Sequence, residues 1–141
     1  MKVLDVNVVL AAHRDAHPQH DVAWSWLGRH VRTREPFAVT DMVAGAFLRL
    51  TTNRRIFETP TPPEAAFEYL VALRAQTGHV LLAPGPRHLD ILRELCLGAD
   101  AVGDLVPDAQ LAAIAIEHAA EVVSFDRDFA RFDTLRWSRP V

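Results

Sequence analysis

Cysteine is almost absent from this sequence of 141 residues: Cys96 is the only one, so the chain forms no internal disulfide and offers no cysteine cluster for zinc. A long apolar run is also missing, because no stretch approaches the roughly 20 apolar residues of a membrane span. The first residues do not resemble a signal peptide, since Lys2 and Asp5 lie close together with no long apolar stretch around them. We therefore expect a soluble, cytoplasmic protein with no membrane association.

An excess of positive charge is missing as well. The formal net charge is −3, so no global positive field marks a nucleic acid as the partner, although a local basic face is still compatible with one. Hydrophobic residues make up 50% of the chain and charged residues 23%, which is the composition of a folded protein rather than a disordered one. The length and composition predict a single domain over residues 1–141 with a sizeable core.

Short apolar segments alternate with helical patterns along the chain. The first is a short buried strand from Val3 that runs into a helix, with Asn7 as the N-cap. Further strands are predicted at residues 37–39, 79–83, 121–125 and, at an edge, 135–137; further helices are predicted from Pro18 to Leu27, from Thr40 or Asp41 to Asn53, from Ala66 to Gly78, from Leu89 to Gly98 and from Pro107 to Ala119. This alternation predicts an α/β fold: a central parallel sheet of four to five strands, flanked by helices on both faces.

Acidic residues follow two of the predicted strands. Asp5 comes after the first strand and Asp126 after the strand at 121–125, while Asp108 lies in the first turn of a helix that should begin on the same side. Because sites in an open parallel sheet form beyond the carboxyl ends of its strands, these carboxylates should converge. Asp104 and Asp128 lie close by in the sequence and are expected to support them.

Like charges brought this close together need a cation between them. Carboxylate oxygens select a hard divalent ion, so the sequence predicts Mg²⁺, or Mn²⁺ in its place. Such an ion can activate water and bind the oxygens of a phosphodiester. Each of these acids taken alone is also an ordinary residue for a helix N-terminus. The prediction of a metal site therefore rests on the set and on the topology that brings it together.

Three segments of the chain point to a known family. They are LDVNVVLA at residues 4–11, AFLRLTTNRRIF at residues 46–57 and PDAQLAAIAIEHAAEVVSFDRDFARFDTLRW at residues 107–137. They resemble segments of the PIN-domain ribonucleases and, within that family, of the VapC toxins of bacterial toxin–antitoxin pairs. The resemblance covers nearly the whole length, and the last segment is the most specific.

The resemblance implies a PIN-like fold and a Mg²⁺-dependent endoribonuclease that hydrolyses RNA phosphodiester bonds, leaving a 5′-phosphate and a 3′-hydroxyl. It implies that Asp5, Asp108 and Asp126 are metal ligands and catalytic residues. The supporting polar residues that match the family are Asn7, Ser124 and Asp128. The implied partners are an RNA substrate, a VapB-type antitoxin and a second copy of the chain in a homodimer.

One departure from the family concerns the helix after the second strand. Many PIN domains carry a glutamate there, a few residues before the arginine that Arg49 matches. The stretch DMVAGAFLR at residues 41–49 contains no glutamate, and Asp41 is its only acid. Either Asp41 substitutes, or the site works with fewer ligands, in which case Asp104 can compensate from its loop.

Arginines and tryptophans offer contacts for RNA. Arg49, Arg54 and Arg55 can hold phosphates near the site, although cations at the end of a helix also suit its dipole in solvent. Trp24 and Trp26 can stack on bases, but two residues apart on one helix they cannot face the same way. One of the two should be a core residue and the other an interface residue.

The histidines invite a zinc site, because His13, His17 and His20 have suitable spacing. Pro18 interrupts any helix that they would share, and no set of cysteines completes a ligand shell. Capping or solvated histidines fit this segment better than zinc ligands do.

Two other functions stay open. The first is an interaction module, a PIN fold with a weakened metal site whose main role is antitoxin binding, and the missing glutamate motivates it. The second is a phosphatase of the haloacid dehalogenase type, which also places an acid after its first strand. That chemistry needs an aspartate two residues after the nucleophile and a downstream lysine, whereas this chain has Asn7 and no lysine beyond Lys2. The phosphatase therefore fits less well.

Overall fold

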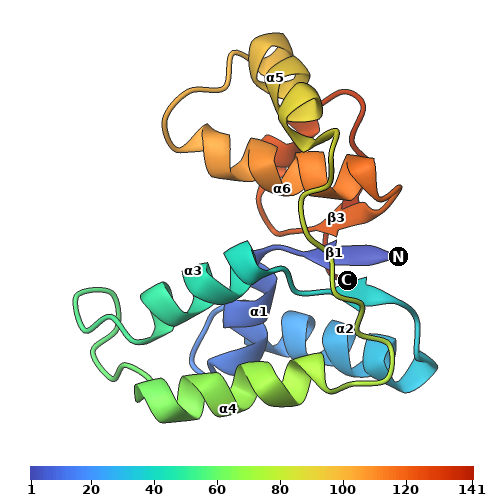
Figure 1. The fold of residues 1–141 in the computed structure, drawn as a ribbon. Coiled ribbons are helices and arrows are strands. Elements are labelled where there is room, and N and C mark those ends of the chain that lie inside the picture. Colours follow the sequence, from blue (N-terminus) through green and yellow to red (C-terminus); the bar gives the residue numbers. More distant parts are fainter.

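A short parallel sheet organises the chain in the computed structural model, which describes residues 1–141 (Figure 1). Its strands are β1 (Lys2–Leu4), β2 (Phe37–Ala38), β3 (Glu121–Val123) and β4 (Trp137–Ser138). Their spatial order is β2-β1-β3-β4, and every neighbouring pair is parallel. Leu4 lies opposite Val123, so the two central strands, β1 and β3, end side by side.

Six α-helices and a 3₁₀ helix surround this sheet: α1 (Val6–His13), α2 (His20–Thr33), α3 (Asp41–Thr51), α4 (Pro63–Arg74), α5 (His88–Ala99), α6 (Leu105–Glu117) and η1 (Arg127–Arg131). In Figure 1, α1 to α4 gather on one side of β1 and β3, and α5 and α6 on the other. The predicted parallel sheet of four to five strands with helices on both faces is confirmed. None of the helices is both long and apolar enough to cross a lipid bilayer.

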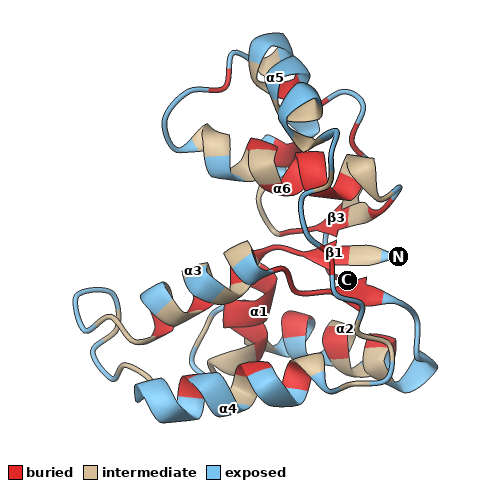
Figure 2. Ribbon diagram, viewed as in Figure 1, coloured by how far each residue is buried: buried red, intermediate tan, exposed pale blue.

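Burial is concentrated where the helices meet the strands, as Figure 2 shows, and the buried apolar side chains form one cluster of 32 residues. Helix α6 contributes six of its residues to this cluster: Ala109, Leu111, Ala112, Ala113, Ile114 and Ala115. Small alanine side chains let a helix approach its neighbours closely, so α6 packs against β3 and η1. This packing fixes the start of α6 beside the end of β3.

The starts of α2 and α6 differ from the sequence-based prediction. Helix α2 begins at His20 instead of Pro18, which lies in a turn where the His20 N–H donates to the carbonyl oxygen of His17 at 2.9 Å. Helix α6 begins at Leu105, two residues before Pro107. The first N–H groups of a helix have no partner within it, so a proline is accommodated in the first turn and does not define the helix start.

Helix α1 follows β1 without a loop. It begins at Val6, whose N–H donates to the side chain of Asp5, so Asp5 is the N-cap and the prediction of Asn7 as the cap is wrong. The predicted cap of α3 is confirmed, because the Thr40 hydroxyl accepts from the Val43 N–H at 3.3 Å. One carboxylate thus ends β1 and starts α1.

The strand predicted at residues 79–83 is wrong. This segment meets the sheet through one parallel bridge between Phe37 and His79. The Phe37 N–H donates to the carbonyl oxygen of Gly78 at 3.0 Å, and the Val80 N–H donates to that of Phe37 at 2.8 Å. The next donor along, the Val39 N–H, bonds to Nε2 of His79 at 3.1 Å instead of to a backbone carbonyl. The imidazole therefore takes the place of a further ladder bond, and no strand develops.

Gly78 offers a test of this edge of the sheet. A Cβ atom at Gly78 would lie 2.7 Å from the carbonyl oxygen of Glu35, so we expect Gly78→Ala to lower the free energy of unfolding by about 1–3 kcal/mol. Gly45, inside α3, has no atom within 4 Å of the same added carbon, and Gly45→Ala should raise it by about 0.5–1 kcal/mol. Urea denaturation of both variants measures the difference, and an equal change in both would contradict the crowding at Gly78.

Candidate metal centre

The candidate centre lies where β1 and β3 end. The Asp5 N–H donates to the Val123 carbonyl oxygen at 3.0 Å, so the backbone pairing of the two strands continues one residue beyond β1. Asp126 follows β3 and is the N-cap of η1, and its Oδ1 accepts from the Asp128 N–H at 2.8 Å. Asp108 lies in the first turn of α6. The backbone therefore brings the acids that follow the strands, Asp5 and Asp126, and the acid at the start of α6, Asp108, to one edge of the sheet, as the sequence predicted.

The hydroxyl of Ser124 is the hub of this centre. Ser124 is fully buried, and its Oγ donates to Oδ2 of Asp5 at 2.6 Å. The same oxygen accepts from Nδ2 of Asn7 at 2.9 Å and from the Asp126 N–H at 2.9 Å. The hydroxyl thus uses its one proton and both lone pairs. A single atom therefore holds Asp5, Asn7 and the backbone of Asp126 in a fixed relation.

Asp5 is buried, with 8% of its surface exposed, yet its charge is not left without partners. Its Oδ1 accepts from the Val6 N–H at 2.7 Å, and its Oδ2 accepts from Ser124. Burial raises the pKa of Asp5; the bonds from Ser124 and Val6 act against this rise, and the charge of Asp126 adds to it. Each carboxylate oxygen keeps a lone pair, so Asp5 can still bind a cation.

Asn7 and the backbone complete the network. Oδ1 of Asn7 accepts from the Phe125 N–H at 3.2 Å, while its Nδ2 donates to Ser124. Asn7 therefore ties α1 to the end of β3 with both ends of its amide. The N–H groups of Val6 and Phe125 are functional groups that the sequence analysis missed, and no residue-type pattern could reveal them because nearly every residue carries such a group.

Three carboxylates come together in front of this network. Asp108, Asp126 and Asp128 each bring one oxygen to within 4.8 Å of the others. Burial raises the pKa of Asp108 to about 7, and the negative charges of Asp5, Asp126 and Asp128 add to the rise. Four acids therefore share one electrostatic environment, and the closest group of three includes Asp128 in place of Asp5.

The residues present fit a hard divalent cation. All the donors are carboxylate oxygens, the ligand type that Mg²⁺ and Mn²⁺ prefer, and no histidine or cysteine belongs to the group. A cation there would offset the repulsion among the acids, which adds to the effect of burial on the pKa of Asp108. The arrangement is suited to binding and polarising an oxygen-rich ligand such as a phosphodiester.

Two of the proposed supporting acids lie outside the group of three. Oδ1 of Asp41 accepts from Nη2 of Arg74 at 2.8 Å, and its side chain is 85% exposed. The same guanidinium donates to the carbonyl oxygen of Val39 at 2.8 Å, which fixes Arg74 beside the start of α3. Asp104 is exposed at the N-cap position of α6 and makes no capping hydrogen bond with its side chain. The charge of Asp41 is thus already balanced by an arginine.

The three arginines proposed for RNA lie at the far end of α3. Arg49 is in its last turn, and Arg54 and Arg55 are in the loop that follows. All three are exposed, and their side chains make no hydrogen bond or ion pair within the protein. Figure 1 shows α3 leading from the sheet toward this loop.

The histidines of the zinc alternative do not form a metal group. His13 bonds to the hydroxyl of Thr61 at 3.0 Å, His17 accepts from the Gln19 N–H at 3.1 Å, and His20 bonds to the Ala11 carbonyl oxygen at 2.8 Å. Each ring therefore has its own structural partner, and the only group of potential metal ligands is the aspartate group.

The two tryptophans face different ways, as their spacing predicted. Trp24 is 62% exposed, whereas Trp26 is half-buried and stacks on His30 with ring centres 4.9 Å apart. Trp24 therefore fits the expected interface residue, and Trp26 packs against the core.

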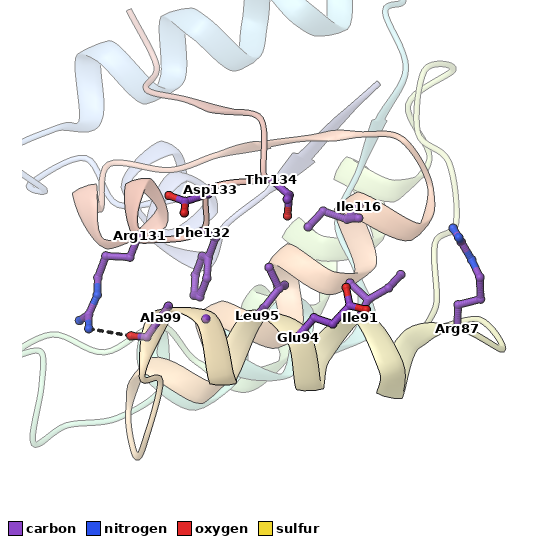
Figure 3. A pocket seen from close by; sticks show the side chains of 11 residues that line it. Arg87, Ile91, Glu94, Leu95, Ala99, Ile116, Arg131, Phe132, Asp133 and Thr134 are labelled. Atoms are coloured by element: carbon purple, nitrogen blue, oxygen red, sulfur yellow. Dashed lines mark hydrogen bonds between the residues drawn. The ribbon is translucent and has the colours of Figure 1, made fainter.

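The structure also contains a cavity of about 370 Å³ (Figure 3). It lies between α5 and the segment after η1, where Nη2 of Arg131 donates to the Ala99 carbonyl oxygen at 3.1 Å. Its lining includes Ile91, Leu95 and Phe132 and none of the four acids of the centre. The acidic centre and this cavity are therefore different parts of the molecule.

Comparison with known proteins identifies the family. The PIN domain family matches residues 2–135. Ribonuclease VapC25 of Mycobacterium tuberculosis (strain ATCC 25618 / H37Rv) is 55% identical over 140 residues, which is 99% of either chain. Ribonuclease VapC43 of the same strain is 41% identical and covers 100% of this chain and 96% of its own. The chain therefore belongs to the PIN-domain family and, within it, to the VapC proteins, as the sequence motifs predicted.

Solved structures agree on the fold. VapBC2 from Rickettsia felis, bound to a DNA fragment from its promoter, gives a TM-score of 0.72 at 16% identity and covers 98% of this chain and 97% of its own. VapC20 of Mycobacterium tuberculosis, described as a sarcin-ricin loop cleaving toxin, gives a TM-score of 0.67 at 18% identity, with 92% and 93% coverage. At this level of identity the likeness concerns the backbone alone.

Asp108 generates a test of the electrostatics. Without metal, Asp108→Asn should be more stable than the wild type at pH 8 by about 1–2 kcal/mol, because burial and then the neighbouring charges disfavour the charged form of Asp108, and solvent screens part of this effect. The folded protein binds this proton more tightly than the unfolded chain does. The wild type therefore loses that stability as pH rises from 3.8 to about 7, and the difference vanishes at lower pH.

Thermal unfolding across this pH range, with and without Mg²⁺, checks the prediction. Mg²⁺ should stabilise the wild type and leave Asp108→Asn nearly unchanged. Asp133→Asn, at an exposed acid outside the group, serves as the control. A variant at Asp108 that gained no stability at pH 8 would contradict the raised pKa of Asp108.

Ser124 generates a second test. Ser124→Ala leaves Oδ2 of Asp5 and Nδ2 of Asn7 without the partner that Ser124 provides, so the free energy of unfolding should fall by about 1–3 kcal/mol. The pKa of Asp5 should rise further, because the bond from Ser124 favours its charged form. Denaturation curves and an NMR titration of Asp5 measure both effects. Ser25→Ala, at an exposed site on α2, is the control and should change neither.

Proposed function

We propose that this VapC protein is a metal-dependent endoribonuclease that acts as the toxin of a VapBC-type pair. The observation that carries the proposal is the group of Asp108, Asp126 and Asp128, whose oxygens lie within 4.8 Å of one another at the carboxyl edge of the sheet. Relatives that share up to 55% of its residues over 99% of its length are named ribonucleases, which supports the same activity here.

The residues that would hold Mg²⁺, or Mn²⁺, are Asp5, Asp108 and Asp126, with Asp128 beside them. When bound, such an ion supplies Lewis-acid stabilisation of a phosphate and activation of a water for in-line attack. The remaining steps belong to the chain itself. The carboxyl of Asp108, whose pKa is raised to about 7 by burial and then by the neighbouring charges, would hold such an ion in its deprotonated form.

Ser124 and Asn7 position the acids and do not touch the reacting atoms. Because Oγ of Ser124 bonds to both Asp5 and the Asp126 backbone, these two acids cannot move independently. Ser124 and Asn7 also bond to each other, and Asn7 bonds to the Phe125 backbone, so the two side chains together set the geometry into which the scissile phosphate fits. Preorganised ligands of this kind lose little entropy when cation and substrate bind.

The partners follow from the same proposal. The substrate is RNA, whose phosphates would meet the exposed guanidinium groups of Arg49, Arg54 and Arg55. We also propose a VapB-type antitoxin, in keeping with the VapBC complex among proteins of the same fold, and a homodimer. The net charge of −3 suits neutralisation by a basic or aromatic antitoxin segment at the acidic edge.

A second candidate is a PIN-fold module with a weakened site that mainly binds antitoxin. Its support is the state of Asp41, which is exposed and paired with Arg74 and so adds no ligand where many PIN domains have a glutamate. The close approach of three other acids favours the enzyme instead. Cleavage of RNA in the presence of metal separates the two candidates.

Asp126→Asn tests the activity. We expect RNA cleavage with Mg²⁺ or Mn²⁺ to fall by at least about 100-fold, because the variant removes a ligand charge from the centre. Growth arrest on expression should disappear with it. Asp133→Asn should cleave like the wild type, since Asp133 is outside the group. Equal absence of cleavage and growth arrest in the wild type and in Asp126→Asn would instead support the antitoxin-binding module.

A further inference from the structure

The loop between α3 and α4, residues 52–62, is held by one arginine from another element. Arg14 is the C-cap residue of α1, and its Nη1 donates to the hydroxyls of Thr51 at 3.1 Å and Thr61 at 3.2 Å. Its Nη2 donates to the carbonyl oxygen of Thr59 at 2.7 Å. The carbon of its guanidinium lies 3.6 Å from the centre of the Phe57 ring. Arg14 therefore binds both the base of the loop and the region near the loop's tip, and so connects the loop to α1.

The base of the loop is a closed network. The Thr61 N–H donates to the carbonyl oxygen of Thr51 at 2.8 Å, and the hydroxyls of these two threonines are 2.8 Å apart. His13 adds a bond from its Nε2 to the Thr61 hydroxyl at 3.0 Å. Thr51 is fully buried, and His13 and Thr61 are half-buried, so the base of the loop is packed against the fold.

The tip of the loop is ordered as well. Oδ1 of Asn53 accepts from the Arg55 N–H at 2.9 Å, and its carbonyl oxygen accepts from the N–H groups of Ile56 and Phe57 at 3.0 Å each. Arg54 and Arg55 are exposed on this turn, and neither guanidinium has a partner. The donors of Arg14 are used within the fold, whereas those of Arg54 and Arg55 are free for a ligand.

We propose that this loop is a second RNA-binding site, remote from the acids, which binds strand phosphates through Arg54 and Arg55, and that Arg14 is its positioning residue. The inference rests on the proposed function, because it takes RNA as the ligand. Guanidinium groups match phosphate with paired hydrogen bonds, and a loop that is already ordered loses less entropy on binding.

The location of the loop explains why it serves RNA. Helix α3 has 11 residues, so the loop lies roughly one helix length of about 16 Å from the sheet edge where Asp5 and Asp108 lie. A polyanion that approaches clustered carboxylates is repelled by them. The unpaired arginines of the loop offset this repulsion. An RNA strand reaches them only when it extends beyond the scissile bond, so they attract the strand without disturbing the acids. Glu58 is the only acid in the loop.

Binding of fluorescein-labelled poly(U) RNA to the Asp126→Asn protein tests the site without requiring cleavage. Replacing Arg54 and Arg55 together by alanine should weaken binding about tenfold and reduce the dependence of log affinity on log salt by about 0.7 for each RNA phosphate that these arginines neutralise. The matched control is Arg93→Ala with Arg139→Ala. It removes the same charge at two exposed, unpaired arginines elsewhere and should weaken binding less than about twofold.

The role of Arg14 is tested by a double-mutant cycle. Arg14→Ala should weaken RNA binding severalfold when Arg54 and Arg55 are present and should add nothing once both are alanine, because it acts only through them. In the active protein the same change should raise KM and leave kcat within about twofold. Phe57→Leu removes the stacking of the ring on the guanidinium but keeps the bulk, and should reproduce the effect if Arg14→Ala lowers the melting temperature too far for assay.

Several outcomes would overturn the inference. If the alanine pair at Arg54 and Arg55 binds RNA like its matched control, the loop is not an RNA site. If that pair instead loses only the antitoxin, the loop binds a protein. If Arg14→Ala weakens binding equally with and without the two arginines, its role is purely structural. Absence of cleavage by the wild type, with RNA binding still dependent on the loop, would reject the proposed activity and leave this site standing.

Discussion

The hydrogen bond from Ser124 to Asp5 joins the two central strands at the point where both end. It forms because β1 and β3 are parallel and in register, with Leu4 opposite Val123, so the next residue of each strand reaches the same edge. A buried carboxylate without such a donor is costly, and Asp5 has a donor on each oxygen. The same hydroxyl also accepts from Asn7 and from the Asp126 N–H, and the side chain of Asp126 in turn accepts from the Asp128 N–H.

At this edge of the sheet, the hydrogen bonds around Ser124 hold the acids together against the repulsion between their charges. The network around Ser124 holds the backbone of Asp126 in place, while burial and neighbouring charges push the pKa of Asp108 to about 7. The fold therefore holds the acids so close together that ionising all of them costs free energy when no metal ion is bound. Asp41 stands outside this balance because it is exposed and paired with Arg74, so it does not supply the charge of the glutamate that many PIN domains carry.

Much of this arrangement could be predicted from the sequence because it depends on topology. Alternating apolar segments and helices predict a parallel sheet, and a parallel sheet brings Asp5 and Asp126 to one edge whatever the details of packing. The closest group of three, with Asp128 in place of Asp5, depends on the direction in which η1 leaves Asp126, and no residue pattern encodes a shift of a few ångströms. The prediction of a strand at residues 79–83 failed for a similar reason. The Val39 N–H bonds to the imidazole of His79 instead of to a backbone carbonyl, and this ends the ladder of hydrogen bonds.

The contact between Ser124 and Asp5 spans 119 residues of sequence, nearly the whole chain. During synthesis on the ribosome, Asp5 emerges first and has no partner until the segment with β3 and η1 follows it. The acidic centre is therefore assembled last, when almost all of the polypeptide has been made. A chain that stops short of residue 121 retains Asp5 and Asp108 but lacks Ser124, Asp126 and Asp128. Incomplete translation products of this protein therefore lack two of the four acids that share one electrostatic environment in the folded chain.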